Sequence, residues 1–374
     1  MLERPLPFSY WPMYKTTRRY GLQSTLFALD PWTIIKANIQ TRCPLAAKPE
    51  ALASLEQAQD FYKVATSAGI MASRPLLLYY CFMNLAKAYA LTVQRQATFN
   101  QAQHGLAERL APGGKELVDA FLQAHKSPGA RTGALNLFDE FLHSISGSGL
   151  PADTNFDLAK LLPQIVPGHR LWAEALDKPE RFIALHDIRL NEDTTNKCIW
   201  LALEFFADDL TRLSVTHSRL LTESKLARTF REVDCGTNIK GRKLIRFEQI
   251  QPRSYTSRAA DEVASLVADI KPHLWTTVAS VPPYRRYYVY LSPVAEHPQV
   301  LPQLLSIYAI TYYLGSITRY RPHHFDSIIA SELGPRIEEF ISGQPLQFIY
   351  LMASEFAEQE VTKPSIVLIC AMFN

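Results

Sequence analysis

Cysteine is scarce in this 374-residue sequence, and its five cysteines are widely scattered. None of them forms a C-x-x-C pair, which argues against a zinc ribbon or a disulfide framework and favours a reducing cytosol. The sequence also lacks an H-E-x-x-H motif and any dense set of aspartates, which argues against a metal site. We therefore expect a cytoplasmic protein that holds no metal and no cofactor.

Long apolar runs are missing as well. No uncharged apolar run approaches the roughly 18 to 20 residues that span a bilayer. The nearest candidate, residues 301–318, contains tyrosines and a glycine and is more typical of a buried helix. The N-terminus has prolines and charges where a signal peptide needs an apolar core. We expect a soluble protein with no membrane partner, and an apolar tail (365–374) that packs against a domain or a partner.

Nucleotide and hydrolase motifs are absent too. The segment APGGKEL (111–117) lacks the spacing of a phosphate-binding loop, and no G-x-S-x-G nucleophile elbow occurs. A strong excess of one charge sign is also lacking, because the formal net charge is only +3. This value is too small for a protein that coats nucleic acid, so any nucleic-acid site must be a local patch.

The pattern of elements divides the chain into three regions, 1–150, 151–292 and 293–374. We expect helices at residues 50–70, 74–96, 259–272, 299–320, 334–341 and 345–361. Strands are expected in KLIRFEQIQP (243–252), LWTTVASV (274–281) and RRYYVYLS (285–292). The glycine- and serine-rich stretch 144–154 is typical of a linker or long loop. The predicted fold class is mainly α (α+β): a helical bundle formed by the N- and C-terminal regions, with the β-containing middle region inserted.

The most interesting stretch is SITRYRPHHFDS (316–327), which places basic residues and histidines behind a long apolar helix. Arg319 and His324 fit the R-x(4–6)-H pattern of HEPN-type ribonucleases. Metal-free RNA cleavage needs a base for the 2′-hydroxyl, an acid for the 5′-oxygen and a cation for the phosphate, and histidine and arginine supply these. Two other Arg–His pairs in the chain have this spacing (Arg181 with His186, Arg212 with His217). Only Arg319, however, ends a long apolar helix, which Pro322 is expected to stop.

The candidate roles follow from this chemistry. Arg319 would hold the phosphate and His324 or His323 would act as acid–base, while Tyr320 and Arg321 would bind the nucleic acid. The alternative is structural, because basic residues in a last helical turn complement the helix dipole. Exposure of Arg319 and His324 along one cleft would favour the first interpretation, and burial of Arg319 against a carboxylate or carbonyls the second.

Two further segments are weaker candidates. Lys240, Arg242 and Lys243 form a basic segment that suits either RNA or the charged edge of a hairpin. His104, in the sequence QHGL, either faces a cleft or has a capping or packing role.

Several of these segments together resemble the YaaC-like family of bacterial proteins: RPLLLYYCFMNLAKAYALT (74–92), HGL (104–106), YYLGSITRYRP (312–322), GPRIEEFI (334–341) and PLQFIYLMASEF (345–356). The resemblance is clearest over residues 50–110 and 285–362.

The tyrosine-rich helix at 74–92, paired with the later R-x4-H helix, is also similar to a distant HEPN-type core. HEPN proteins are often RNA-cleaving toxins or phage-defence effectors that work as dimers. The resemblance thus implies RNA as a partner, possible endoribonuclease activity and a homo-oligomer or a protein partner in the same system. The alternative is a non-catalytic interaction or oligomerisation module.

Overall fold

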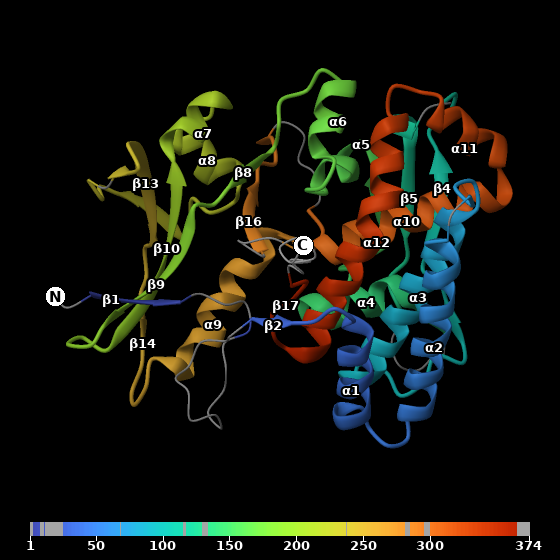
Figure 1. Cartoon of the computed structure of the whole chain (residues 1–374), viewed down its shortest axis with the longest axis horizontal. Helices are drawn as coiled ribbons and strands as arrows, with labels where there is room; N and C mark the ends of the chain where they lie inside the picture. The colour runs from blue at the N-terminus through green and yellow to red at the C-terminus, as the bar shows by residue number, and fades with distance from the viewer. Residues whose placement is uncertain are drawn as a thin grey trace, which may run out of the picture. The chain divides into compact units, whose positions relative to one another are not determined.

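A computed structural model describes residues 3–7, 11, 25–67, 69–114, 117–128, 134–236, 238–280, 285–294 and 300–364 (Figure 1). The chain has an α+β fold and divides into two compact units. We call residues 32–180 and 297–357 the helical unit, and residues 1–31, 181–296 and 358–374 the sheet unit. These boundaries differ from the three predicted regions, since 151–180 groups with the helices and both chain ends group with the middle. The apolar tail, 365–374, lies outside the described residues.

The helical unit contains most of the long helices. Its helices are α1 (Pro31–Arg42), α2 (Lys48–Ala65), α3 (Arg74–Thr92), α4 (Leu137–Ser146), α5 (Leu158–Leu161), α6 (His169–Ala175), α10 (Gln303–Tyr320), α11 (Pro322–Ile329) and α12 (Gly334–Ala357), with short 3₁₀ turns η1 (Leu117–Asp119) and η2 (Leu162–Gln164). In the described chain, no helix has both the length and the apolar character needed to cross a membrane.

Helix α3 is the centre of this unit. It packs against α2, α4, α10 and α12 (Figure 1), and its own residues are buried on most sides. Pro75 lies in its first turn, where a missing N–H costs nothing. Helix α10 is buried from Leu304 to Ile317 and approaches α3 closely at Gly315. The helices predicted at 74–96 and 299–320 are therefore confirmed, with ends a few residues shorter.

A small antiparallel sheet interrupts this helical unit. Strands β4 (Leu106–Leu110), β5 (Ala120–Ala124) and β7 (Thr154–Asp157) pair in the order β4-β5-β7, and β3 (Ala102–Gln103) pairs with β6 (Leu135–Asn136). The prediction of a mainly helical N-terminal region, 1–150, missed strands β3, β4, β5 and β6. The predicted loop at 144–154 is in part the end of α4, which closes at Gly147 in the left-handed conformation (φ 78°).

The C-terminal helices also depart from prediction. The two helices predicted at 334–341 and 345–361 form one continuous helix, α12, which contains Pro345. Pro322 does not simply stop a helix, because α10 ends at Tyr320 and α11 begins at Pro322. His323 and His324 consequently lie in a first helical turn, where Pro322 fits because its missing N–H would have no partner there.

A buried arginine ties α12 to the segment before α6. Arg336 has no exposed surface, and its guanidinium donates to the carbonyl oxygens of Pro167 (2.8 Å), Leu162 and Ile165 (both 3.4 Å). Burial lowers the pKa of Arg336 to about 10. The close fit needs Gly168, which has φ 72° and where an added Cβ would lie 2.4 Å from the arginine Nη1.

The sheet unit is built on a larger antiparallel sheet with the order β1-β9-β10-β13-β11, and β12 and β14 pair with β13 and β10. Its elements are β1 (Glu3–Pro7), β2 (Leu26–Phe27), β8 (Phe182–Ala184), β9 (Asp187–Asp193), β10 (Cys198–Phe206), α7 (Ala207–Arg212), α8 (His217–Glu223), β11 (Phe230–Val233), β12 (Asn238–Ile239), β13 (Arg242–Gln249), β14 (Arg253–Ser254), α9 (Ala260–Ile270), η3 (Lys271–His273), β15 (Leu274–Val278), β16 (Arg285–Tyr290) and β17 (Val361–Thr362). Strands β15, β16 and β8 form a second sheet, and β17 pairs with β2.

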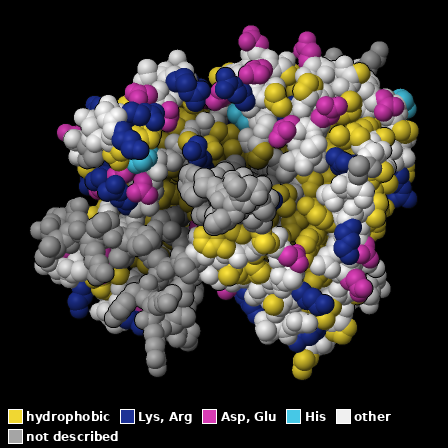
Figure 2. Space-filling view, in the orientation of Figure 1, with side chains coloured by type: hydrophobic (Ala, Val, Ile, Leu, Met, Phe, Trp, Pro, Cys, Tyr) yellow, Lys and Arg dark blue, Asp and Glu magenta, His cyan; other side chains and the backbone are white. Residues whose placement is uncertain are grey.

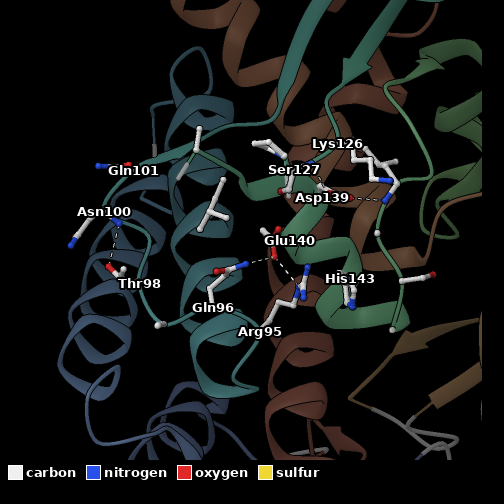
Figure 3. Close-up of a pocket in the computed structure, with 18 residues that line it drawn as sticks. Arg95, Gln96, Thr98, Asn100, Gln101, Lys126, Ser127, Asp139, Glu140 and His143 are labelled. Atoms are coloured by element: carbon white, nitrogen blue, oxygen red, sulfur yellow. Dashed lines mark hydrogen bonds and ion pairs between the residues drawn. The ribbon is translucent and has the colours of Figure 1, made fainter. Parts of the chain in front are cut away.

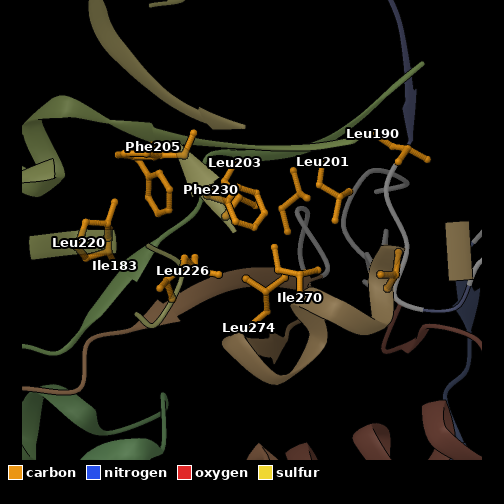
Figure 4. Packing of buried hydrophobic residues seen from close by; sticks show 14 of the residues in the cluster. Ile183, Leu190, Leu201, Leu203, Phe205, Leu220, Leu226, Phe230, Ile270 and Leu274 are labelled. Carbon is orange, nitrogen blue, oxygen red and sulfur yellow. The ribbon is translucent and has the colours of Figure 1, made fainter. Parts of the chain in front are cut away.

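One face of the larger sheet carries the core of this unit. Leu201, Leu203 and Phe205 alternate along β10 and pack with Phe230 and with Ile270 of α9 (Figure 4). Because successive side chains of a strand point to opposite faces, the alternation places these three residues on the same face of β10, which is buried on both faces from Ile199 to Phe205. The predicted strands within 243–252, 274–281 and 285–292 and the helix within 259–272 are confirmed as β13, β15, β16 and α9.

Candidate functional site

The end of α10 is where its buried apolar surface gives way to exposed basic and aromatic residues. The helix is buried as far as Ile317, whereas Arg319 and Tyr320 are exposed, Tyr320 to 64%. Arg321 then leaves helical geometry (φ −143°, ψ 61°), which turns the chain into α11. This local break places Arg319 on the surface of the helical unit.

Arg319 turns toward helix α3. Its Nη1 donates to the hydroxyl of Tyr80 (3.1 Å), and its guanidinium carbon lies 5.0 Å from the ring centre of Tyr320. Tyr80 in turn stacks on Phe61 of α2, with ring centres 5.3 Å apart. Arg319 contacts neither a carboxylate nor a helix-end carbonyl among the described residues. Its guanidinium N–H groups that do not bind Tyr80 can therefore bind an anion.

His104 lies close to this arginine. Its Nδ1 is 2.5 Å from the hydroxyl of Tyr79, while its side chain stays exposed. Gly105, next to it, has φ 75°, and an added Cβ would lie 2.9 Å from the Cβ of Asn136. The glycine thus permits the tight turn that presents His104 beside Tyr79.

The electrostatic surroundings favour a neutral imidazole. Partial burial, followed by the positive charges of Lys87 and Arg319, lowers the pKa of His104. Tyr79 is buried, and burial together with neighbouring Tyr308 raises the pKa of its hydroxyl well above the usual range. The arrangement is a neutral histidine, oriented by a protonated tyrosine, in a cationic environment.

The second member of the R-x4-H pattern is placed differently. His324 is 9% exposed, and its Nε2 is 3.1 Å from the hydroxyl of Tyr313 on α10. Burial, then the charges of Arg321 and His323, lowers the pKa of His324. No hydrogen bond joins Arg319 to His324 in the described structure, and it is His104 whose pKa responds to Arg319. His323 is exposed on the first turn of α11.

Arg321 has a structural partner. Its Nη2 lies 3.7 Å from Glu108 on β4, and the other oxygen of Glu108 accepts a hydrogen bond from Ser316 (2.7 Å). The hydroxyl of Tyr312 donates to the carbonyl of Leu106 (2.6 Å). These contacts attach the small sheet to α10 and leave Arg321 less free than Arg319 to bind a ligand.

The second basic segment lies in the sheet unit, in the hairpin between β12 and β13. Lys240 and Gly241 form its turn, with φ 50° and 79°. Arg242 is bound to Asp208 (3.0 Å) and Asp209 (3.1 Å) and stacks on Phe206 (3.7 Å). Lys240 and Lys243 are exposed.

The described residues form no metal cluster near these side chains, and the face seen in Figure 2 carries no broad basic surface. Within the residues that the structure describes, no group of three or more His, Cys, Asp or Glu side chains is placed to hold a metal ion. On the face seen in Figure 2, lysine and arginine are interspersed with aspartate and glutamate. Ligand binding at the end of α10 would therefore depend on the exposed side chains of Arg319 and His104.

Sequence reasoning named Arg319 and His104 but did not pair them. It missed Tyr79, Tyr80 and Lys87, which share helix α3. The tyrosine pair in the middle of an apolar helix was the available signal, yet tyrosines at such positions are usually part of the core. Tyr79 is indeed buried, so only the fold reveals that its hydroxyl reaches His104.

The fold and site define an α+β protein with a surface group of histidine, arginine and tyrosine at a helix end. The chain belongs to the YaaC-like family, whose family model matches residues 16–356. No curated protein and no solved structure matches it.

Proposed function

We propose that this protein binds RNA at the end of α10 and cleaves it without a metal ion, as a HEPN-like component of a bacterial phage-defence or toxin system. The observation that carries the proposal is that two exposed side chains, His104 and Arg319, bind the hydroxyls of the adjacent residues Tyr79 and Tyr80 on α3, at 2.5 and 3.1 Å. The proposal includes a HEPN-like helical bundle for the helical unit, with α3 and α10 as its central pair.

Each side chain has a chemical role in this proposal. Arg319 holds the phosphate through its free N–H groups and stabilises the extra negative charge of the transition state. His104 donates Nδ1–H to the Tyr79 oxygen, which leaves the Nε2 lone pair to take the proton of the RNA 2′-hydroxyl. The 2′-oxygen attacks phosphorus, and the 5′-oxygen leaves with a proton from solvent. The products are a 2′,3′-cyclic phosphate and a 5′-hydroxyl.

The aromatic residues around Arg319 suit single-stranded RNA. Tyr320 is largely exposed, and a base stacked on an aromatic ring contributes roughly 1–3 kcal/mol. Because stacking on an aromatic ring tolerates any base, we expect RNA binding to depend only weakly on sequence. Because Arg319 contacts phosphate, we expect RNA binding to weaken as salt is raised.

Total RNA incubated with the purified protein tests this proposal, with and without a chelator. We expect cleavage that resists the chelator, and His104→Ala should slow it by about 100-fold or more, the usual contribution of a positioned base. Arg319→Ala should reduce both binding and cleavage. Arg170→Ala, which removes another exposed arginine of the helical unit, is the matched control and should leave the rate unchanged. If the His104 and Arg319 variants both retain full activity, the proposal is wrong.

A non-catalytic interaction or oligomerisation module is the second candidate. It is favoured by the burial of His324 against Tyr313 and by the ion pair of Arg321 with Glu108, both of which are structural roles. Absence of cleavage, together with a homodimer or larger assembly in light scattering, would support this candidate over the first.

A further inference from the structure

A second site lies in the helical unit, apart from the end of α10. A half-open pocket of about 990 Å³ is lined by α4, the segment that follows α3, and the loops at 126–128 and 147–150 (Figure 3). This volume is in the range of small-molecule sites, which are roughly 300–1,000 Å³. None of the described residues that line it is Phe, Tyr or Trp, and polar side chains from several segments point toward its centre.

The central group of the pocket is the carboxylate of Glu140, a residue only 1% exposed. One oxygen, Oε2, receives both of its contacts: Nε of Arg95 at 2.9 Å and Nε2 of Gln96 at 2.8 Å. Among the described residues, the other oxygen, Oε1, accepts no hydrogen bond. Figure 3 shows both contacts converging on one side of the carboxylate. Oε1 is therefore available to accept a hydrogen bond from a ligand that supplies a donor.

Asp139, the residue before Glu140, differs from it because both of its carboxylate oxygens accept hydrogen bonds. Asp139 accepts from the backbone N–H groups of Ser127 (2.7 Å) and Leu150 (2.5 Å), so both of its oxygens are satisfied by the pocket walls. It fixes the two loops, and Gly149 is needed beside it, because an added Cβ would lie 2.5 Å from its Oδ1. Asp139 therefore shapes the pocket, while Glu140 retains capacity for a ligand.

The charge in the pocket selects the type of ligand. Arg95 already neutralises Glu140, so the site has no need of an ionic ligand. The remaining groups include an acceptor (Glu140 Oε1), the outer N–H donors of Arg95, and the imidazole of His143, one turn further along α4. Two adjacent hydroxyls match them, because one donates to the carboxylate while the other accepts from the guanidinium. A carboxylate that binds ribose hydroxyls is also a recurrent arrangement in nucleotide sites.

We propose that this pocket binds the vicinal diol of a sugar through Glu140 and Arg95, either in a free sugar or in the ribose of a nucleoside. The inference is independent of RNA cleavage at the end of α10. It concerns different residues and a different assay, so either proposal can fail alone.

Calorimetric titration of the full chain with ribose, adenosine and 2′-deoxyadenosine tests the diol. Binding of both ribose and adenosine supports a sugar site, and binding of adenosine alone supports a nucleoside site. In each case 2′-deoxyadenosine should bind at least about tenfold more weakly, because it leaves one buried polar group without a partner. Equal binding of adenosine and 2′-deoxyadenosine, or no binding of any of the three, overturns the proposal.

Two variants locate the site. Glu140→Gln should weaken binding by about tenfold or more, since a hydrogen bond to a charged group is lost. Glu174→Gln changes a glutamate that is mostly exposed in the same unit and is the matched control. If Glu140→Gln does not fold, Ala97→Phe decides, because it fills the pocket from an exposed wall position and leaves the Glu140–Arg95 pair intact. Unchanged affinity in a folded Ala97→Phe variant overturns the assignment.

Discussion

Gly315 allows α10 to approach α3, and its replacement by alanine sets two opposing effects against each other. An added Cβ would lie 3.1 Å from the Cβ of Tyr79, 3.2 Å from the carbonyl oxygen of Pro75 and 3.4 Å from the Cα of Leu76. Two of these three atoms are backbone, which cannot move aside cheaply. Overpacking of this kind costs about 1–3 kcal/mol, whereas replacing a glycine in a helix by alanine gains roughly 0.5–1 kcal/mol. Gly315→Ala should therefore destabilise the protein by about 1 kcal/mol, and by about 2.5 kcal/mol at most.

Gly343 provides a matched control within α12. Its added Cβ would meet only the end of the flexible Glu339 side chain, at 3.1 Å. Gly343→Ala should thus stabilise the protein by roughly 0.5–1 kcal/mol. Urea unfolding measures both changes. If Gly315→Ala is as stabilising as Gly343→Ala, the close approach of α10 to α3 is wrong, and with it the placement of Arg319 beside Tyr80.

Two further predictions concern buried polar groups of the helical unit. Arg336→Ala should cost roughly 3–5 kcal/mol in urea unfolding, because it leaves three carbonyls unpaired and a cavity behind. Glu338→Ala, at an exposed site of the same helix, should change the free energy of unfolding by less than about 0.5 kcal/mol. A small loss for Arg336→Ala would contradict the hydrogen bonds described for this arginine. Because burial lowers the pKa of His324, the unfolded chain binds its proton more readily. Its contribution to stability is full above the ordinary pKa of about 6.5 and is lost as the pH falls through the lowered value. His324→Gln should reduce the stability difference between about pH 7.5 and about pH 5.5, whereas the exposed His323→Gln should not, and identical pH profiles would refute the burial of His324.

Elements with a strong local pattern could be predicted from the sequence. The apolar periodicity of α3 and α10 and the alternation along β13 are enough to identify these three elements. Strands β4 and β5 have no such pattern, because LAERL and AFLQA consist largely of good helix formers. Their strand conformation depends on pairing with each other, which is a tertiary effect that local propensity does not contain.

The candidate site also depends on tertiary contacts that the local sequence pattern does not contain. The spacing of Arg319 and His324 suggested a pair, yet a hydrogen bond to Tyr313 on α10 holds His324 in the interior. His104 and Arg319 are far apart in the sequence and come together through the adjacent Tyr79 and Tyr80 of α3, which they contact from the turn at Gly105 and from the end of α10. Glu140 and Arg95 likewise come from separate elements, so the diol pocket has no signature in the sequence.

The most direct test of the proposed function compares RNA cleavage by His104→Ala and His324→Ala in the presence of a chelator. We predict that His104→Ala loses about 100-fold or more in rate, whereas a folded His324→Ala retains most of its activity, because His104 is exposed and His324 is buried against Tyr313. Loss of cleavage in His324→Ala together with full activity in His104→Ala would contradict the account and restore the R-x4-H pair as the catalytic unit.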